Sequence, residues 1–178
     1  MQDVKTSGLK LPLAVFLVSF AYYVGLCAKQ WTWIFVSADS GDWLASSIWW
    51  FVPQPLGSPL FLLLGHFLNL FPGSLVLKET ILLSCLPAAI TVTLVYLITS
   101  HLSSWKYGLL ASLMALGAGV ALSQSTVLEE YALAAMFLVL SYWLYLKNRQ
   151  NLILVALGCG TAIHVAILPI VLFWLYIE

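Results

Sequence analysis

Charged side chains are scarce in this sequence: they make up only 8% of its 178 residues, whereas hydrophobic residues make up 62%. A soluble domain carries about 25% charged residues, because they cover its surface in water. The scarcity of charge therefore excludes an ordinary water-soluble domain and indicates an integral membrane protein.

The sequence also lacks an excess of charge of either sign, and it has few cysteines. A formal net charge of zero provides no basic field that would attract nucleic acid. The three cysteines, an odd number, all lie in apolar runs without the spacing of a disulfide framework or a metal site. We therefore interpret Cys27, Cys85 and Cys159 as small buried hydrophobic residues.

Long apolar runs extend over most of the chain, and we expect residues 1–178 to form a single membrane domain. We expect an all-α protein with about five transmembrane helices, at residues 11–28, 80–100, 107–127, 131–146 and 152–177. A signal peptide is the alternative for the first run, since Lys5 and Lys10 precede it. No small-residue cleavage site follows, which favours an uncleaved span.

Residues 29–79 form a large first outer loop in this interpretation. The run from Asp42 to Phe51 has helical potential, with Ser40 or Asp39 as a plausible N-cap. Residues 59–71 are apolar but too few to cross a bilayer, so we expect a second short helix along the membrane surface.

The placement of charges predicts the orientation. With the N-terminus in the cytoplasm, five of the seven basic residues lie inside and six of the seven acidic residues lie outside, as the positive-inside rule expects. Counting residues 59–71 as a full span would instead move Lys147 and Arg149 outside. We therefore expect a multi-pass protein of a bacterial or archaeal plasma membrane or of the endoplasmic reticulum.

Two acidic groups fall on the same outer side in this topology. Asp39 and Asp42 lie in the first outer loop, and Glu129 and Glu130 lie in the short second one. Such acids can act as a general base or hold a divalent cation. The structural alternative is that Asp39 caps a helix and that the glutamates form a solvated turn, and spacing alone leaves both interpretations open.

Several motifs in register resemble one family. These are Asp39-Ser40-Gly41-Asp42, Pro55-Leu56-Gly57-Ser58-Pro59-Leu60, Ser123-Gln124, Glu129-Glu130-Tyr131-Ala132-Leu133, and finally Gly160 and His164. Together they resemble the protein O-mannosyltransferase-like membrane proteins, long filed as a domain of unknown function within the glycosyltransferase-C superfamily. The resemblance covers most of the chain, and it implies a glycosyltransferase-C-like N-terminal module.

This resemblance implies an enzyme that transfers a sugar from a polyprenyl-phosphate donor to a protein or glycolipid acceptor on the outer or luminal side. It implies Asp39 as the catalytic carboxylate and Glu129 as a second acidic residue of the site, with Asp42, Gln124 and His164 in supporting roles. Leu56, Ser58, Gln54 and Glu130 depart from the family's usual residues, which leaves the donor and acceptor details open.

A few further polar residues are candidates for the site. Lys29 and Lys78 are the basic residues on the outer side and are therefore candidates for the donor phosphate, with interfacial snorkelling as the alternative. His164 lies near the middle of the expected last span, where an ionisable side chain indicates function by default; the alternative is a neutral histidine that bonds a neighbouring helix. His66 and His101 are expected at the interface. Whether a divalent cation binds stays open.

Two other interpretations remain at this stage: a small transporter or channel subunit, and a non-catalytic remnant or assembly partner. A transporter should carry polar groups through several spans, but the second span offers only Thr91 and Thr93. Because a lipid-linked donor needs a groove between helices, we also expect residues 1–178 to be an incomplete N-terminal module.

Overall fold

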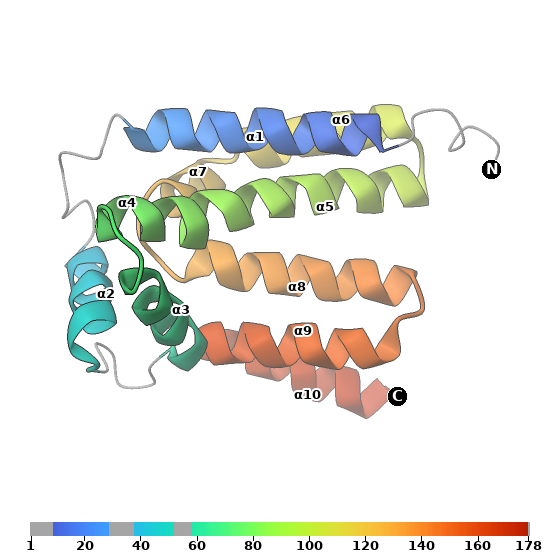
Figure 1. The fold of residues 1–178 in the computed structure, drawn as a ribbon. Coiled ribbons are helices and arrows are strands. Elements are labelled where there is room, and N and C mark those ends of the chain that lie inside the picture. The colour runs from blue at the N-terminus through green and yellow to red at the C-terminus, as the bar shows by residue number, and fades with distance from the viewer. Residues whose placement is uncertain (1–8, 29–37, 52–57, 178) are drawn as a thin grey trace.

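The computed structural model describes residues 9–28, 38–51 and 58–177, and every regular element in these ranges is a helix. The all-α prediction is confirmed for this part of the chain. Helices α1 (Lys10–Ala28), α5 (Leu86–Leu102), α6 (Trp105–Gly117), α8 (Tyr131–Leu146) and α9 (Gln150–Ile163) run side by side along one common direction (Figure 1). Helices α2 (Ala38–Trp49) and α3 (Pro59–Asn69) lie across one end of this bundle.

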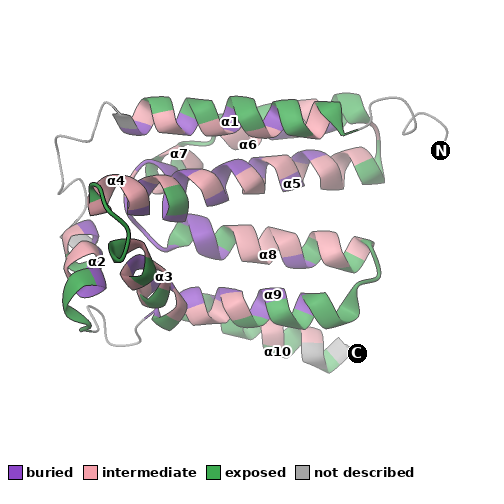
Figure 2. Ribbon diagram, in the orientation of Figure 1, coloured by how far each residue is buried: buried purple, intermediate pink, exposed green. Residues whose placement is uncertain are grey.

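Helix α5 occupies the middle of the bundle, where it packs against α1, α6 and α8. Its buried face carries small and apolar residues, among them Ala89, Val92 and Tyr96. The outer face of α1 is largely exposed, as expected for a helix that meets lipid (Figure 2). A second cluster of buried residues joins α2 and α3 to α8 and α9 through Trp43, Phe61 and Leu157.

Among the described residues, two helices are long and apolar enough to cross a membrane, and a bent pair raises the number to three. The first is α1, at the position expected for the first span. The second runs without interruption over Leu75–Leu102, through α4 (Leu75–Glu79), the π-helical turn η2 (Thr80–Cys85) and α5. It begins earlier than the expected boundary at residue 80, so that Lys78 and Glu79 are part of the helix and not of the outer loop.

The third expected span, residues 107–127, is bent. Helix α6 ends at Gly117, and α7 (Gly119–Ser125) continues at an angle of 63°. Ala118 between them has an extended backbone with φ −64° and ψ 124°, which interrupts the helical hydrogen bonding. The bend leans α7 toward the end of the bundle that holds α2 and α3 (Figure 1).

The prediction of one continuous helix over residues 152–177 is wrong. Helix α9 ends at Ile163, and His164 adopts an extended conformation before the 3-10 turn η3 (Val165–Ile167) and α10 (Leu168–Ile177). The chain reverses there, because Trp174 of α10 packs on Tyr145 at the end of α8, with 4.9 Å between ring centroids. Helices α9 and α10 therefore form a hairpin (Figure 1).

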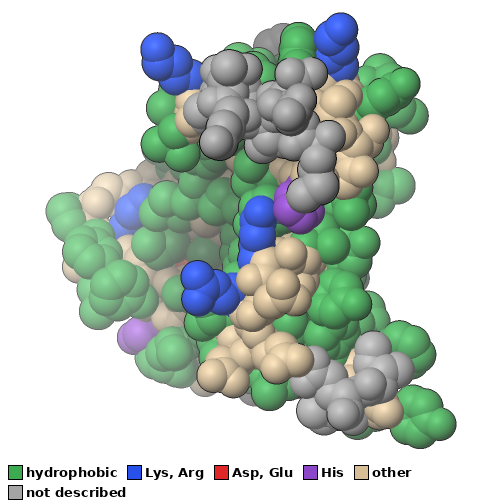
Figure 3. All heavy atoms as spheres, turned by 90° about the vertical axis from the view of Figure 1, so that its right-hand side faces the viewer, with side chains coloured by type: hydrophobic (Ala, Val, Ile, Leu, Met, Phe, Trp, Pro, Cys, Tyr) green, Lys and Arg blue, Asp and Glu red, His purple; other side chains and the backbone are tan. Residues whose placement is uncertain are grey.

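In the described part of the chain, charged residues of opposite sign lie at opposite ends of the bundle, except for Lys78, which lies beside Glu79. We call one end the acid end; it holds α2, α3 and the α7–α8 connection, and it carries Asp42, Glu79, Glu129 and Glu130. The other, the basic end, carries Lys10, Lys106, Lys147 and Arg149. On the face that shows the basic end, no acidic side chain of the described residues is visible (Figure 3). The separation of charge along the bundle agrees with the predicted topology, and which end faces the cytoplasm stays a prediction.

Candidate active site

The start of α2 is joined to the connection between α7 and α8. The Ser40 hydroxyl is buried and donates a hydrogen bond to the backbone oxygen of Leu128 at 3.0 Å, across 88 residues of sequence. Asp39 precedes Ser40 in the first turn of α2, so the backbone of one predicted catalytic residue lies near the segment that carries the other, Glu129. Helix α2 begins at Ala38, earlier than expected, and neither Asp39 nor Ser40 is its N-cap. The side chain of Asp39 lies outside what the structure describes.

Glu129 and Glu130 are buried, with only 4% and 1% of their surfaces exposed. The alternative of a solvated interfacial turn is therefore wrong for both. Glu130 precedes the first residue of α8, and its backbone oxygen accepts a hydrogen bond from the Ala134 amide at 2.9 Å. Helix α8 thus fixes the backbone of both acids at its N-terminal end, where the helix dipole favours negative charge.

His164 faces this pair of acids from the break between α9 and α10. Its Nδ1 accepts a hydrogen bond from the Ala166 amide at 3.1 Å, so the proton of the neutral ring resides on Nε2. Nε2 lies 4.0 Å from Oε1 of Glu130. The imidazole also packs on the ring of Tyr131, with 5.1 Å between centroids. The predicted supporting residue His164 therefore contacts Glu130, the neighbour of the predicted Glu129.

Glu79 is a buried acid that sequence reasoning missed, since it was assigned to the outer loop. It is fully buried where α2 and α3 cover the start of the long helix. An added Cβ on Gly65 would lie 2.2 Å from the Ser47 hydroxyl oxygen and 2.8 Å from a Glu79 carboxyl oxygen, so α3 approaches both closely. Gly65, a glycine inside the short apolar run 59–71, is the sequence feature that could have indicated this close approach.

The remaining predicted residues lie apart from this cluster. Lys78 donates hydrogen bonds from Nζ to the backbone oxygens of Leu68, at 2.8 Å, and of Phe71, so it caps the C-terminal end of α3. Its contact with a phosphate stays a prediction. Asp42 is exposed on α2, Gln124 lies partly buried on α7, and Lys29 lies outside the described residues.

The other two histidines lie at opposite ends. His66 of α3 accepts a hydrogen bond at Nε2 from the Trp50 indole at 2.9 Å, and its Nδ1 lies 3.0 Å from the Ser47 backbone oxygen. Both contacts are satisfied together by a neutral ring with its proton on Nδ1. His101 packs edge-on against Trp143 at the basic end.

Within the described ranges, no three His, Cys, Asp or Glu side chains lie close enough together to hold a metal ion. The pairing of Asp39 with Glu129 around a divalent cation involves a side chain outside those ranges. It therefore stays a prediction.

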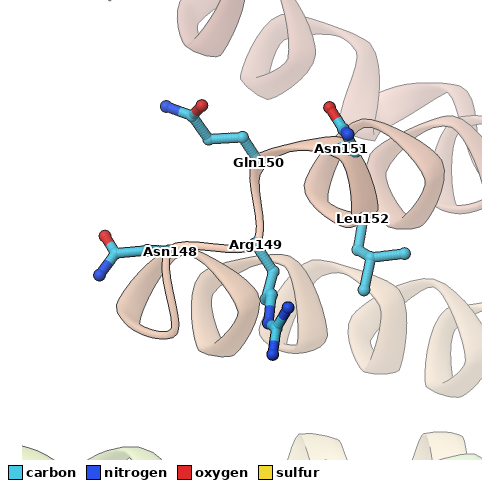
Figure 4. A pocket seen from close by; sticks show the side chains of 5 residues that line it. All are labelled: Asn148, Arg149, Gln150, Asn151 and Leu152. Atoms are coloured by element: carbon cyan, nitrogen blue, oxygen red, sulfur yellow. The ribbon is translucent and has the colours of Figure 1, made fainter.

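A polar hollow of about 400 Å³ lies at the basic end, along the turn between α8 and α9. Asn148 has a φ of 53°, in the left-handed region that asparagine tolerates better than most residues. The side chains of Asn148, Arg149, Gln150 and Asn151 fan out from the turn and do not converge on one point (Figure 4). This open turn is consequently a weaker candidate for a reaction site than the acid end.

Comparison with known proteins assigns this sequence to a family. No curated protein and no solved structure matches the chain. A family profile, however, matches residues 39–177, which include Asp39, both buried glutamates and the hairpin with His164. Because the match spans most of the sequence, the chain belongs to the family described as the protein O-mannosyl-transferase TMEM260 N-terminal domain.

Proposed function

We propose that this chain is the acid-bearing membrane module of a glycosyltransferase of the glycosyltransferase-C superfamily. It transfers a sugar, mannose by the description of its family, from a polyprenyl-phosphate donor to a protein or lipid acceptor on the outer or luminal face. The family membership supports the reaction class, and the separation of charge between the two ends supports the choice of face.

The observation that carries the proposal is the hydrogen bond from Ser40 to the Leu128 backbone oxygen. It holds the first turn of α2, with Asp39, against the segment that bears Glu129. In the proposed reaction the Asp39 carboxylate takes the proton from the acceptor hydroxyl. At the same time the acceptor oxygen attacks the anomeric carbon of the sugar. The bond from that carbon to the phosphate oxygen breaks, and the polyprenyl phosphate leaves with the electron pair.

The buried acids Glu129 and Glu130 support this role from the second segment. Nε2 of His164 faces Glu130, and this contact orients the Glu130 carboxyl. Both glutamates are buried, so bulk water is excluded from them. Exclusion of water strengthens electrostatic interactions with a developing charge. Glu129, which follows Leu128 directly, is the second acid in the proposal.

The transporter alternative has less support from the central helix. The hydroxyls of Thr91 and Thr93 donate to backbone oxygens of their own helix, Pro87 at 2.9 Å and Ala89 at 2.8 Å. Hydroxyls bonded in this way offer little to a passing ion. The acids whose side chains the structure describes moreover gather at one end and are not spaced along the bundle.

The test is the substitution Asp39→Asn, assayed with a radiolabelled polyprenyl-phosphate mannose in membranes that contain the protein in its natural form. Asparagine has the same size but is not a base, so transfer should fall by about 10²–10⁴-fold while membrane insertion is retained. Glu129→Gln should lower transfer by a smaller factor.

Lys147→Gln at the basic end is the matched control, and its activity should equal that of the wild type. If Asp39→Asn retains full activity where the wild type is active, Asp39 has a structural role only and the proposal is wrong.

A further inference from the structure

A partly open cavity of about 280 Å³ lies between helices α1, α5, α6, α7 and α8. We call it the slot. It lies beneath the bend at Ala118, where α7 turns away from the axis of α6. Ala88, Ala121 and Ala132 face it from three helices, and these short side chains leave it open. Its walls are otherwise almost entirely apolar, which suits a hydrocarbon chain.

Four side chains bring polar atoms to this wall: Tyr23, Thr91, Gln124 and Tyr131. The Thr91 hydroxyl is bonded to the Pro87 backbone oxygen of its own helix. Within the described part of the chain, neither Oε1 of Gln124 nor the hydroxyl of Tyr23 has a hydrogen-bond partner in good geometry, although both atoms are buried. The Tyr23 hydroxyl lies beside that of Ser125, whose own proton goes to the backbone oxygen of Ala121. Buried polar atoms in native proteins are nearly always hydrogen-bonded, so an exception requires an explanation. An amide oxygen accepts hydrogen bonds, and the missing partner of Gln124 is therefore a donor.

The slot is continuous with the acid end. Tyr131 lines it and packs on His164, and Tyr131 follows Glu130 directly in the chain. A molecule that filled the slot would thus have one end beside the buried acids and the rest among alanine and valine side chains. A membrane lipid with hydroxyl groups on its head has this combination of properties.

We propose that the slot binds the head-proximal hydrocarbon of the sugar-bearing lipid donor, and that Gln124 accepts a hydrogen bond from a sugar hydroxyl. The inference rests on the proposed function for the identity of the lipid. It gives Gln124 the task of positioning the sugar at the mouth of the slot, and it gives Ala121 the task of keeping the slot open. Phosphatidylcholine, whose head has no hydrogen-bond donor for Gln124, is not retained.

The experiment is photolabelling of the protein in its natural membrane-embedded form. The probe is a polyprenyl-phosphate mannose with a diazirine on the chain close to the phosphate, and a diazirine phosphatidylcholine serves for comparison. The mannose lipid should label peptides that contain α7 or the start of α8. Excess unlabelled mannose lipid should suppress that labelling, and excess phosphatidylcholine should not.

Two variants test the two tasks separately. Ala121→Phe fills the slot and should reduce labelling at least about tenfold, because an aromatic ring occupies much of a cavity of this size. Gln124→Leu keeps the size but removes the acceptor, and the loss of one hydrogen bond should reduce labelling about tenfold. Gly158→Phe is the matched control, since nothing lies within 4 Å of a Cβ added there; its labelling should be unchanged.

If Ala121→Phe fails to insert, Gln124→Leu decides alone. Equal labelling by phosphatidylcholine, or labelling unaffected by Gln124→Leu, overturns the inference. Loss of specific labelling in a protein that still transfers sugar would overturn the slot but not the proposed function. Conversely, specific labelling of an Asp39→Asn variant that remains fully active would overturn the role of Asp39 and leave the slot intact.

Discussion

At the basic end of the bundle, Lys106, Lys147 and Arg149 are exposed, whereas at the acid end Glu79, Glu129 and Glu130 are buried. Nζ of Lys147 lies 4.4 Å from the ring centroid of Trp143, an arrangement that leaves the ammonium accessible to water and headgroups. Burying a carboxyl group in protein is costly unless the surroundings compensate for the lost hydration. The comparison teaches that the basic charges lie where water can reach them, while three of the four described acids at the acid end lie inside the protein.

The largest expected effect concerns the hairpin that returns the chain from the acid end to the basic end. In a cysteine-depleted background with its insertion confirmed, Asp42→Cys should react with an impermeant thiol reagent from outside intact cells. Asn148→Cys should react only after permeabilisation. Tyr176→Cys, at a position 87% exposed, should behave like Asn148→Cys, because α10 returns to the basic end.

Labelling of Tyr176→Cys from outside intact cells would indicate a single continuous helix over residues 152–177. Labelling of Asn148→Cys from outside would instead contradict the predicted orientation of the whole bundle.

The second prediction compares charge reversal at the two ends. Glu130→Lys places a cation in a buried position next to His164, and we expect it to lower the free energy of unfolding by about 3–5 kcal/mol. Lys147→Glu changes an exposed charge and should lower it by less than about 1 kcal/mol. Thermal unfolding of the purified variants in detergent measures both, and equal losses would show that burial does not distinguish the ends.

The third and smallest effect concerns the close approach of α3 to Glu79. Gly65→Ala should destabilise the protein by about 1–3 kcal/mol, because the new methyl group collides with the Ser47 hydroxyl. Gly158→Ala, at an exposed position of α9, is the control, because the added methyl group meets nothing within 4 Å.

The double variant Gly65→Ala, Ser47→Ala tests the cause, since it removes the colliding oxygen. Recovery of at least half of the lost stability is expected. No recovery would mean that the damage arises elsewhere, at Glu79 for example.

The pattern of apolar runs predicted several features of the fold correctly. The all-helical character of the described residues, the first span and the short helix near residues 59–71 all agree with the structure. For His164 the sequence left two interpretations open, a role in the site and a hydrogen bond to a neighbouring helix. In the structure it ends α9 and faces Glu130.

The errors have two origins. The bend at Ala118 and the reversal at His164 occur within largely apolar runs, whereas the long helix begins earlier than expected because it includes Lys78 and Glu79, two charged residues that suggested a loop. Hydropathy measures whether a segment prefers lipid to water, and it contains little information about where an apolar helix turns. The roles of Asp39 and Glu129 remain predictions, supported by the contact between their segments.

The sequence by itself determined that the protein is a helical membrane protein with its acids and bases separated, because hydropathy and charge are properties of each residue and add along the chain. Tertiary structure alone decided that Glu79, Glu129 and Glu130 are buried, that α9 and α10 form a hairpin, and that a slot opens beside Gln124. These features depend on contacts such as the one between Ser40 and Leu128, 88 residues apart. The local sequence around either residue contains no information about the other, so this contact follows only from how the helices pack.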